Sequence, residues 1–301
     1  MRHILTIKDL PKEDIIKIVD KAIYIKKKPW KFSKAMYEKS MLMIFEQPSL
    51  RTILSFETAM TQMGGHAINY YSALSPWDVG KESIEDVGKV ISRYVDISIA
   101  RISNHDEIIK LAQNSSIPII NALSNKEHPC QVLGDILTIY EKKKRLNNLQ
   151  LTYLGDANNN VTYSLMYACK KLGIKMNIAC PQTKEFLPDK QSIEETNISI
   201  FKDSAEAAKN SDIIYTDSFM SYHIPKNQKQ RRIKVLKQYQ VTNKIMSYAK
   251  QDAIFMHCLP ASRGQEVTSD VIDGKQSVVF DQAENRLYIQ KSIILWCLGK
   301  I

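Results

Sequence analysis

The stretch MLMIFEQPSLRTILSFETAM, residues 41–60, joins an apolar run typical of a buried strand to a run with helical spacing. In the second run the apolar residues recur at helical intervals, at Ile53, Phe56, Met60 and Met63. A helix that begins at Leu50, has Ser49 as its N-cap and stops before Gly64 is therefore predicted. A strand, a short polar turn and a helix, in this order, are the unit from which α/β domains are built.

The turn between that strand and that helix carries residues that suit an anion. Arg51 stands in the first turn of the predicted helix, where the positive end of the helix dipole disfavours a cation. A bound phosphate would reverse this cost, because the backbone N–H groups, the hydroxyls of Ser49 and Thr52 and the guanidinium would all point at one anion. Plain helix capping is the alternative, and it accounts for Ser49 alone.

The alternation of strand and helix continues along the chain. Further strand-like runs occupy 66–71, 96–102 and 117–123, then 149–154, 174–180, 198–201, 212–216, 253–259 and 277–280. Helix-like segments separate these runs, so we expect an α/β fold of two doubly wound domains with parallel sheets.

The polar stretch EKKKRLNN, residues 141–148, separates the two successions. The last segment of the chain has helical spacing at Ile289, Ile293, Trp296 and Cys297. We therefore predict a first domain over 1–140 and a second over 141–283, with a C-terminal helix at 284–301 that packs back on the first domain.

Composition limits the class of protein. The chain has 301 residues, a formal net charge of +10 and no run of about 18 apolar residues, so we expect a cytoplasmic protein with no membrane segment. The five cysteines form no CxxC pair, which favours free thiols over disulfides or a metal site. Much of the positive charge is lysine on predicted helix faces and no nucleic-acid-binding motif accompanies it, so no nucleic-acid partner is expected.

Polar side chains also follow other predicted strands. His128 and Gln131 open a helical run after the strand at 117–123, and Arg101 lies at the end of the strand at 96–102. Each residue alone is more often structural than functional. Together they lie where open α/β sheets bind ligands, at the carboxyl ends of strands.

Two further stretches have the same position in the second half. LGDANNNVTYSL, residues 154–165, has only Gly155 where a dinucleotide fingerprint needs three glycines, so its asparagines predict helix caps and a polar pocket instead. FMHCLPASRG, residues 255–264, ends a strand with His257 and Cys258. Cys258 is either a buried small apolar residue or a thiol that contacts substrate.

Taken together, these motifs resemble the aspartate/ornithine carbamoyltransferase family. Seven of them occur in the family's order: Pro48-Ser49-Leu50-Arg51-Thr52, Ser55-Phe56-Glu57, His128-Pro129-Cys130-Gln131, Gly155-Asp156 with Asn159-Asn160, Tyr239-Gln240-Val241, His257-Cys258-Leu259-Pro260 and Ala283-Glu284-Asn285-Arg286. The aspartate branch of the family usually has Thr in place of Cys130 and Pro in place of Cys258. Both cysteines therefore favour the ornithine branch.

The resemblance implies an activity and an assembly. Family members transfer a carbamoyl group from carbamoyl phosphate to an amine, here the side-chain amine of L-ornithine, which gives L-citrulline and phosphate. They need no metal or organic cofactor. They form homotrimers or multiples of trimers, in which the loop corresponding to 72–83 reaches the neighbouring subunit's site, and the ornithine branch belongs to arginine metabolism.

The resemblance also assigns roles to residues. The carbamoyl phosphate site falls to Ser49, Leu50, Arg51, Thr52, Arg101, His128, Gln131 and Arg286. The ornithine site falls to Asn160, Asp217, Ser221, Tyr222, Cys258 and Leu259. The catalytic residues are Arg101, His128 and Gln131, which would stabilise charge on the carbonyl oxygen, and Cys258, which would lie beside the reacting amine.

Several positions depart from the family pattern. Leu50 and Ile53 stand where Thr and Arg are usual, and Asp78 stands where Gln is usual. In the stretch DSFMSYH, 217–223, the usual Trp, Met and Gly are replaced by Phe219, Tyr222 and His223. Two alternatives therefore stay open: a carbamoyltransferase for another amine, such as putrescine or a modified ornithine, or a catalytically weak protein that binds a small anion.

Overall fold

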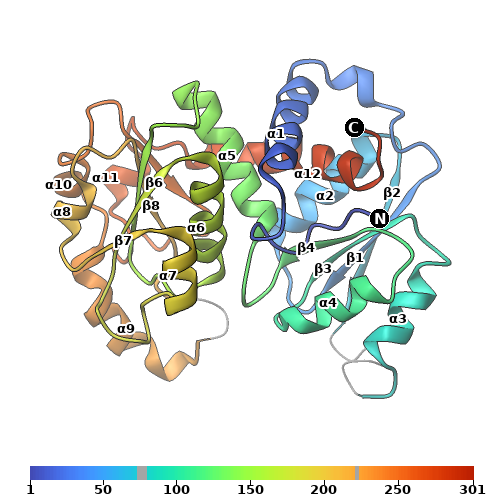
Figure 1. The fold of residues 1–301 in the computed structure, drawn as a ribbon, viewed down its shortest axis with the longest axis horizontal. Coiled ribbons are helices and arrows are strands. Elements are labelled where there is room, and N and C mark those ends of the chain that lie inside the picture. Colours follow the sequence, from blue (N-terminus) through green and yellow to red (C-terminus); the bar gives the residue numbers. More distant parts are fainter. Residues whose placement is uncertain (73–79, 221–223) are drawn as a thin grey trace. The chain divides into compact units, whose positions relative to one another are not determined.

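The computed structural model describes residues 1–72, 80–220 and 224–301 of the chain. These residues form two compact units (Figure 1): unit 1 comprises Met1–Leu137 with Glu284–Ile301, and unit 2 comprises Thr138–Ala283. The unit boundaries fall inside two helices, α5 (Pro129–Lys143) and α12 (Val279–Cys297). Within the described ranges, no helix has the length and apolar character needed to cross a membrane.

Unit 1 is built on a parallel sheet with strand order β2-β1-β3-β4. Its strands are β1 (Ser40–Phe45), β2 (His66–Tyr71), β3 (Ile97–Arg101) and β4 (Ile119–Leu123). Its helices, besides parts of α5 and α12, are α1 (Lys12–Lys27), the short η1 (Pro29–Phe32), α2 (Leu50–Gln62), α3 (Ile84–Ile91) and α4 (His105–Gln113). Helices α1, α2 and α12 lie on one side of the sheet and α3 and α4 on the other (Figure 1).

The last helix packs on unit 1, as predicted. Ser292 of α12 donates its hydroxyl to the backbone oxygen of Ile18 in α1 at 2.6 Å, and the indole N–H of Trp296 donates to Asp14 at 3.1 Å. Ile289 and Ile293 are fully buried. This contact joins two ends of the sequence into one core.

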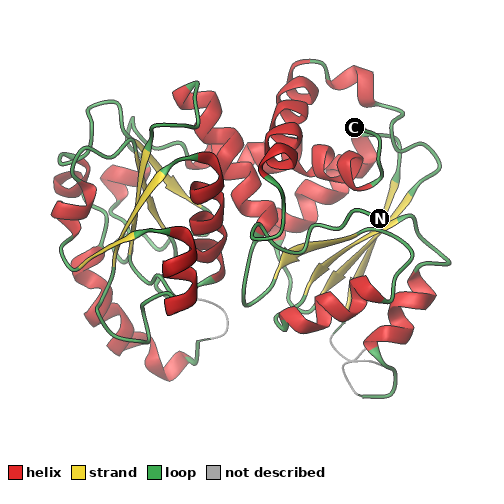
Figure 2. Cartoon of the chain, in the orientation of Figure 1, coloured by secondary structure: helices red, strands yellow, loops and turns green. Residues whose placement is uncertain are grey.

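Unit 2 holds a second parallel sheet, with strand order β7-β6-β5-β8-β9. Its strands are β5 (Gln150–Leu154), β6 (Lys175–Ala179), β7 (Ser199–Phe201), β8 (Ile213–Thr216) and β9 (Ile254–His257). Its helices are α6 (Asn160–Leu172), α7 (Lys190–Thr196), α8 (Ser204–Ala208), η2 (Lys226–Gln228), α9 (Lys229–Leu236), η3 (Lys237–Tyr239), α10 (Asn243–Met246) and α11 (Ser269–Ile272). Helices flank both sheets, which confirms the predicted α/β class with doubly wound parallel sheets (Figure 2).

One predicted strand is wrong. In the run SVVF, 277–280, only Ser277 makes an isolated bridge, to Phe255, and α12 begins at Val279. A short apolar run fits a buried strand and a buried helix equally well. Asp281 in the first turn of α12 favours the helix, because a carboxylate there is stabilised by the helix dipole.

Each sheet has a point at which the strand order reverses. In unit 1 this point lies between β1 and β3, and Phe45 pairs there with Arg101. In unit 2 it lies between β5 and β8, where Leu154 pairs with Thr216. Open α/β sheets bind ligands at the carboxyl ends of the strands at such points.

Candidate functional site

The start of α2 follows β1 at the reversal point of unit 1. Ser49 has the extended backbone of an N-cap, with φ −147° and ψ 105°, but its side chain caps no backbone N–H. Its hydroxyl instead donates to Oγ1 of Thr52 at 3.0 Å. The first turn of α2 holds no acidic residue. The predicted helix start at Leu50 is confirmed, and the Ser49 hydroxyl does not occupy the backbone N–H groups of the first turn.

Three arginines act on one buried histidine in unit 1. His128, only 6% exposed, immediately precedes α5. Burial lowers the pKa of His128 well below its ordinary value, and the guanidiniums of Arg286, Arg101 and Arg51 lower the same pKa further. A charge shifts the pKa of a group only when it lies in the neighbourhood of that group. The structure therefore brings together four of the residues assigned to carbamoyl phosphate.

Gln131 and Arg286 hold each other. Nη1 of Arg286 donates to Oε1 of Gln131 at 2.6 Å, and the Gln131 amide donates to Oδ1 of Asp135 at 2.8 Å. Gly134 makes room for the arginine, because a Cβ there would come within 3.3 Å of the Arg286 Cδ. Both side chains are nearly fully buried, so the pair is fixed before any ligand arrives.

The lowered pKa of His128 predicts a dependence of folding stability on pH. An unfolded histidine has a pKa of about 6.5. Below this pH, His128 is protonated in the unfolded chain but stays neutral in the folded protein until the pH reaches its lower, folded-state pKa. Its contribution to stability is therefore complete above about pH 6.5 and is lost as the pH falls toward the folded pKa, by at most about 1.4 kcal/mol per pH unit. Urea unfolding at pH 7 and at pH 5.5 should show a smaller loss for His128→Asn than for the parent protein. Equal losses of unfolding free energy in the two proteins would contradict a lowered pKa of His128.

In unit 2, the turn after β5 positions the start of α6. Gly155 has φ +125°, and a Cβ there would come within 3.1 Å of the Phe219 ring. Asn159 caps α6 by accepting the backbone N–H of Thr162 at 2.9 Å. Asn160, the first residue of α6, is half-buried. The predicted helix caps in the asparagine run are thus confirmed for Asn159.

Asp217 and Cys258 meet at the ends of β8 and β9. The register pairs Thr216 with His257, so the next residue of each strand lies side by side. The Cys258 thiol donates to Oδ1 of Asp217 at 3.0 Å, and the same oxygen accepts the backbone N–H of Ser218 at 2.7 Å. Cys258 is the half-exposed cysteine, whereas the other four are buried. Cys258 is partly exposed and its thiol contacts a carboxylate at a strand end. This environment favours a thiol that contacts a substrate amine over a buried apolar residue.

Within the described part of the chain, one cluster has ligand atoms close enough for a metal: Asp217, His257 and Cys258, all within 4.8 Å of one another. Both nitrogens of the His257 ring lie against groups of the protein itself. Its Nδ1 accepts the backbone N–H of Leu259 at 2.8 Å, so Nε2 carries the proton, and this Nε2 lies 3.4 Å from the carboxylate of Glu266. Two ligands remain, fewer than the three that a catalytic zinc site takes from protein.

Comparisons with known proteins decide the family. The aspartate/ornithine carbamoyltransferase carbamoyl-P binding domain matches residues 2–141, and the Asp/Orn binding domain of the same family matches residues 147–297. The chain belongs to this carbamoyltransferase family.

Individual relatives agree with this result. The chain is 40% identical to the ornithine carbamoyltransferase of Methanococcus aeolicus, over 99% of this chain and all of the relative. It is 43% identical to the catabolic ornithine carbamoyltransferase of Halobacterium salinarum, over 98% of each. Among solved structures, the ornithine carbamoyltransferase of Pyrococcus furiosus superimposes with a TM-score of 0.92 at 40% identity, over 100% of this chain and 98% of that one.

Some positions of the carbamoyltransferase lie outside the described residues. Ser221 and Tyr222, assigned to ornithine, are among them, as are His223 and Asp78 and most of the loop 72–83. Phe219 is described, and it is fully buried in the core of unit 2. Its replacement of the usual Trp is thus a change inside the core.

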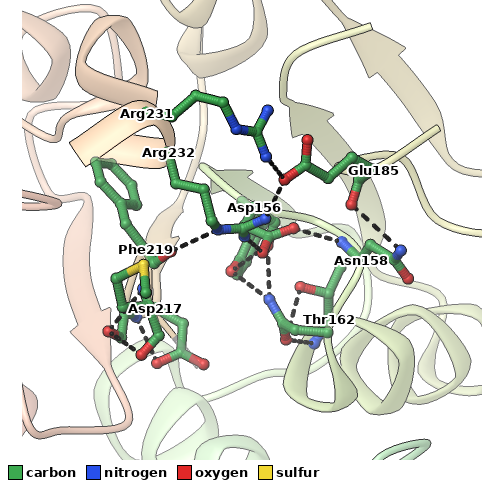
Figure 3. A network of polar contacts seen from close by, with 12 residues as sticks. Asp156, Asn158, Thr162, Glu185, Asp217, Phe219, Arg231 and Arg232 are labelled. Carbon is green, nitrogen blue, oxygen red and sulfur yellow. Dashed lines mark hydrogen bonds and ion pairs between the residues drawn. The ribbon is translucent and has the colours of Figure 1, made fainter. Parts of the chain in front are cut away.

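A buried ionic group in unit 2 was missed by the sequence analysis. Arg232 contacts Asp156 and Glu185 beside the turn that leads to α6 (Figure 3). Arg232 stands in the basic run KNQKQRRIK, 226–234, in which nothing distinguishes it from its exposed neighbours. Its contact with Asp156 spans 76 positions in the sequence, which no local pattern encodes.

Proposed function

We propose that this protein transfers the carbamoyl group of carbamoyl phosphate to the side-chain amine of L-ornithine, giving L-citrulline and phosphate. The observation that carries the proposal is the position of the two groups of polar residues at the reversal points of the two sheets. Full-length similarity to proteins named ornithine carbamoyltransferase supports the same reaction.

In unit 1, the start of α2 would bind the phosphate. Ser49, Arg51 and Thr52, with the backbone N–H of Leu50, would hold its oxygens, and phosphate would then leave with the electrons of the C–O bond that breaks. The Leu50 side chain is 70% exposed, so only its backbone serves here. A fixed cation at the phosphate stabilises the charge that the leaving group gains.

The carbonyl oxygen of the carbamoyl group would face Arg101, His128, Gln131 and Arg286. Negative charge grows on this oxygen when the amine attacks the carbonyl carbon, and donors fixed in advance stabilise it without reorganising. Because the pKa of His128 is lowered, its imidazole is neutral at neutral pH and acts as a polarising donor.

In unit 2, ornithine would bind with its carboxylate toward Asn160 at the start of α6, and with its side-chain amine beside Asp217 and Cys258. Ser221, Tyr222 and the backbone of Leu259 complete the proposed ornithine site. The amine, with a pKa of about 10.4 for a lysine-like group, must lose a proton before it attacks. Activity is therefore expected to rise with pH through the neutral range.

The test is an assay of carbamoyl phosphate with ornithine and, separately, with putrescine, at about pH 7 and about pH 9. Citrulline and phosphate should form in equal amounts, and kcat/KM for ornithine should exceed that for putrescine by at least about 10²-fold, because a site that binds a carboxylate rejects an amine that lacks one. A larger value for putrescine at both pH values would exclude ornithine as the acceptor. Binding of carbamoyl phosphate with no turnover of any amine would exclude a transferase altogether.

We also propose that the chain forms a trimer, or a multiple of trimers, in the cytoplasm. The edge strand β2 supports self-association, because its exposed side chains include Ile68, Tyr70 and Tyr71. Apolar side chains on an uncovered sheet edge suit contact with another chain. A solution mass of one chain would contradict the trimer.

A further inference from the structure

Arg232 of α9 is a nearly fully buried cation that contacts three groups in unit 2. Its Nη2 donates to Oδ2 of Asp156, its Nη1 donates to Glu185 at 2.7 Å, and its Nε donates to the backbone oxygen of Phe219 at 3.3 Å. The guanidinium also lies over the ring of Phe186, at 4.7 Å from its centroid. The planar fork of an arginine can serve these three directions at once, whereas a lysine cannot.

One of these contacts leads to the start of α6. The other carboxylate oxygen of Asp156 accepts the backbone N–H of Asn158 at 3.1 Å. The backbone oxygen of Asp156 accepts the side-chain amide of Asn159 at 2.6 Å, and Asn159 in turn caps α6. Asn160 is the next residue, so a shift of Asp156 would displace it.

Another contact leads to the segment 217–220. Phe219, whose backbone oxygen receives the Arg232 Nε, lies two residues after Asp217, and Asp217 accepts the Cys258 thiol (Figure 3). Within the segment, the Ser218 hydroxyl accepts the backbone N–H of Met220 at 3.2 Å. One guanidinium therefore links the two segments that carry Asn160 and Asp217.

We propose that Arg232 is a positioning residue that fixes the spacing between the carboxylate-binding end and the amine-binding end of the ornithine site, and thereby sets the affinity for the acceptor. This inference rests on the proposed function for the identity of the acceptor. Such a spacing would select a diamino acid by its length, because its carboxylate and its amine must be bound at the same time.

The burial of Asp156 explains why the position requires a cation. Burial raises the pKa of Asp156 to about 6, and the Arg232 guanidinium opposes this effect. An arginine that merely balanced this charge could be replaced by lysine. A positioning arginine could not, because a single ammonium beside Asp156 would leave the Phe219 backbone oxygen without its Arg232 donor and would leave Glu185 with Arg231 alone of its two arginines.

The neighbouring Arg231 provides a matched control. Arg231 is half-exposed, and within the described part of the chain its guanidinium pairs with the carboxylate of the same Glu185 (Figure 3). Arg231→Met removes a guanidinium one position away and leaves the Arg232 contacts intact.

The experiment compares Arg232→Lys with Arg231→Met in the full-length protein. We expect Arg232→Lys to raise KM for ornithine about tenfold while KM for carbamoyl phosphate stays within about twofold, because carbamoyl phosphate is assigned to unit 1. Arg231→Met should change neither constant by more than about twofold. A wild-type KM for ornithine in Arg232→Lys, or equal increases in both variants, would overturn the proposal.

A second measurement does not depend on turnover. The rate at which iodoacetamide alkylates Cys258, read by mass spectrometry of its peptide, should rise about threefold in Arg232→Lys, since a displaced Asp217 no longer holds the thiol proton. Arg231→Met should keep the parent rate. If the parent protein forms no citrulline, the proposed function fails, and this rate alone decides the role of Arg232: an unchanged rate overturns it.

Discussion

Replacement of Arg51 by alanine is expected to lower kcat/KM for carbamoyl phosphate by roughly 10³-fold, because a bidentate, charge-assisted contact with phosphate contributes several kcal/mol. The structure places Arg51 in the first turn of α2 with no acidic residue beside it. Its guanidinium also helps to lower the pKa of His128, which is one of the residues proposed to face the carbonyl oxygen. Steady-state kinetics with carbamoyl phosphate varied at saturating ornithine measure the loss.

A matched control separates this effect from a general change in charge. Arg93 lies in the same unit and is exposed, and Arg93→Ala removes the same charge from the chain. We expect Arg93→Ala to keep kcat/KM within about twofold of the parent value. If Arg51→Ala behaved like Arg93→Ala, the start of α2 would not be the phosphate site.

Two residues beside Arg51, Leu50 and Ile53, differ from the usual family motif and affect the size of the expected loss. Leu50 supplies only a backbone N–H, and Ile53 is half-buried on the apolar side of the helix. The helix start has thus lost a hydroxyl and a cation relative to the usual family motif. In the proposed phosphate site, more of the affinity would then come from Arg51 and from the N–H groups, which makes the expected loss larger.

The fold was predictable because its signals are local. β1 and α2 begin within one residue of their predicted starts, since a strand-like apolar run and a capped amphipathic helix each carry their own pattern. The prediction of a strand at 277–280 is wrong because this run carries no local pattern of its own. Its four residues are too few to show a period, and what favours the helix lies outside the run, in Asp281 of the first turn and in the packing of α12 on unit 1.

The polar core of each unit was not predictable, because its partners are distant in the sequence. Gln131 and Arg286 are 155 positions apart, and no spacing rule links them. The sequence does place Arg101 correctly at the end of a strand and His128 correctly at the start of a helix, because the end of one element and the start of another are local properties. Which of these side chains meet is decided by the packing of α12 against α5, which is a property of the tertiary structure.

Asp217→Asn is expected to lower kcat/KM for ornithine by roughly 10²-fold or more at pH 7.5 and to leave KM for carbamoyl phosphate within about twofold. Asparagine keeps the shape of the side chain but removes the negative charge that would hold the substrate ammonium. It also puts an amide where the Cys258 thiol now donates to a carboxylate oxygen. Both changes act on the amine and neither acts on the groups assigned to phosphate, which all belong to unit 1.

The pH profile distinguishes this role from a structural one. A carboxylate beside the amine favours the charged ammonium, so in the parent protein the rate should rise with pH through the neutral range. Without that carboxylate, the bound amine loses its proton more readily, and the rise in kcat should shift to lower pH in Asp217→Asn. Asp273→Asn is the control, because Asp273 is an exposed carboxylate of the same unit paired with Arg263. An unshifted profile together with an unchanged kcat/KM in Asp217→Asn would remove Asp217 from the acceptor site, because a charge next to the reacting amine cannot be deleted without changing one of the two.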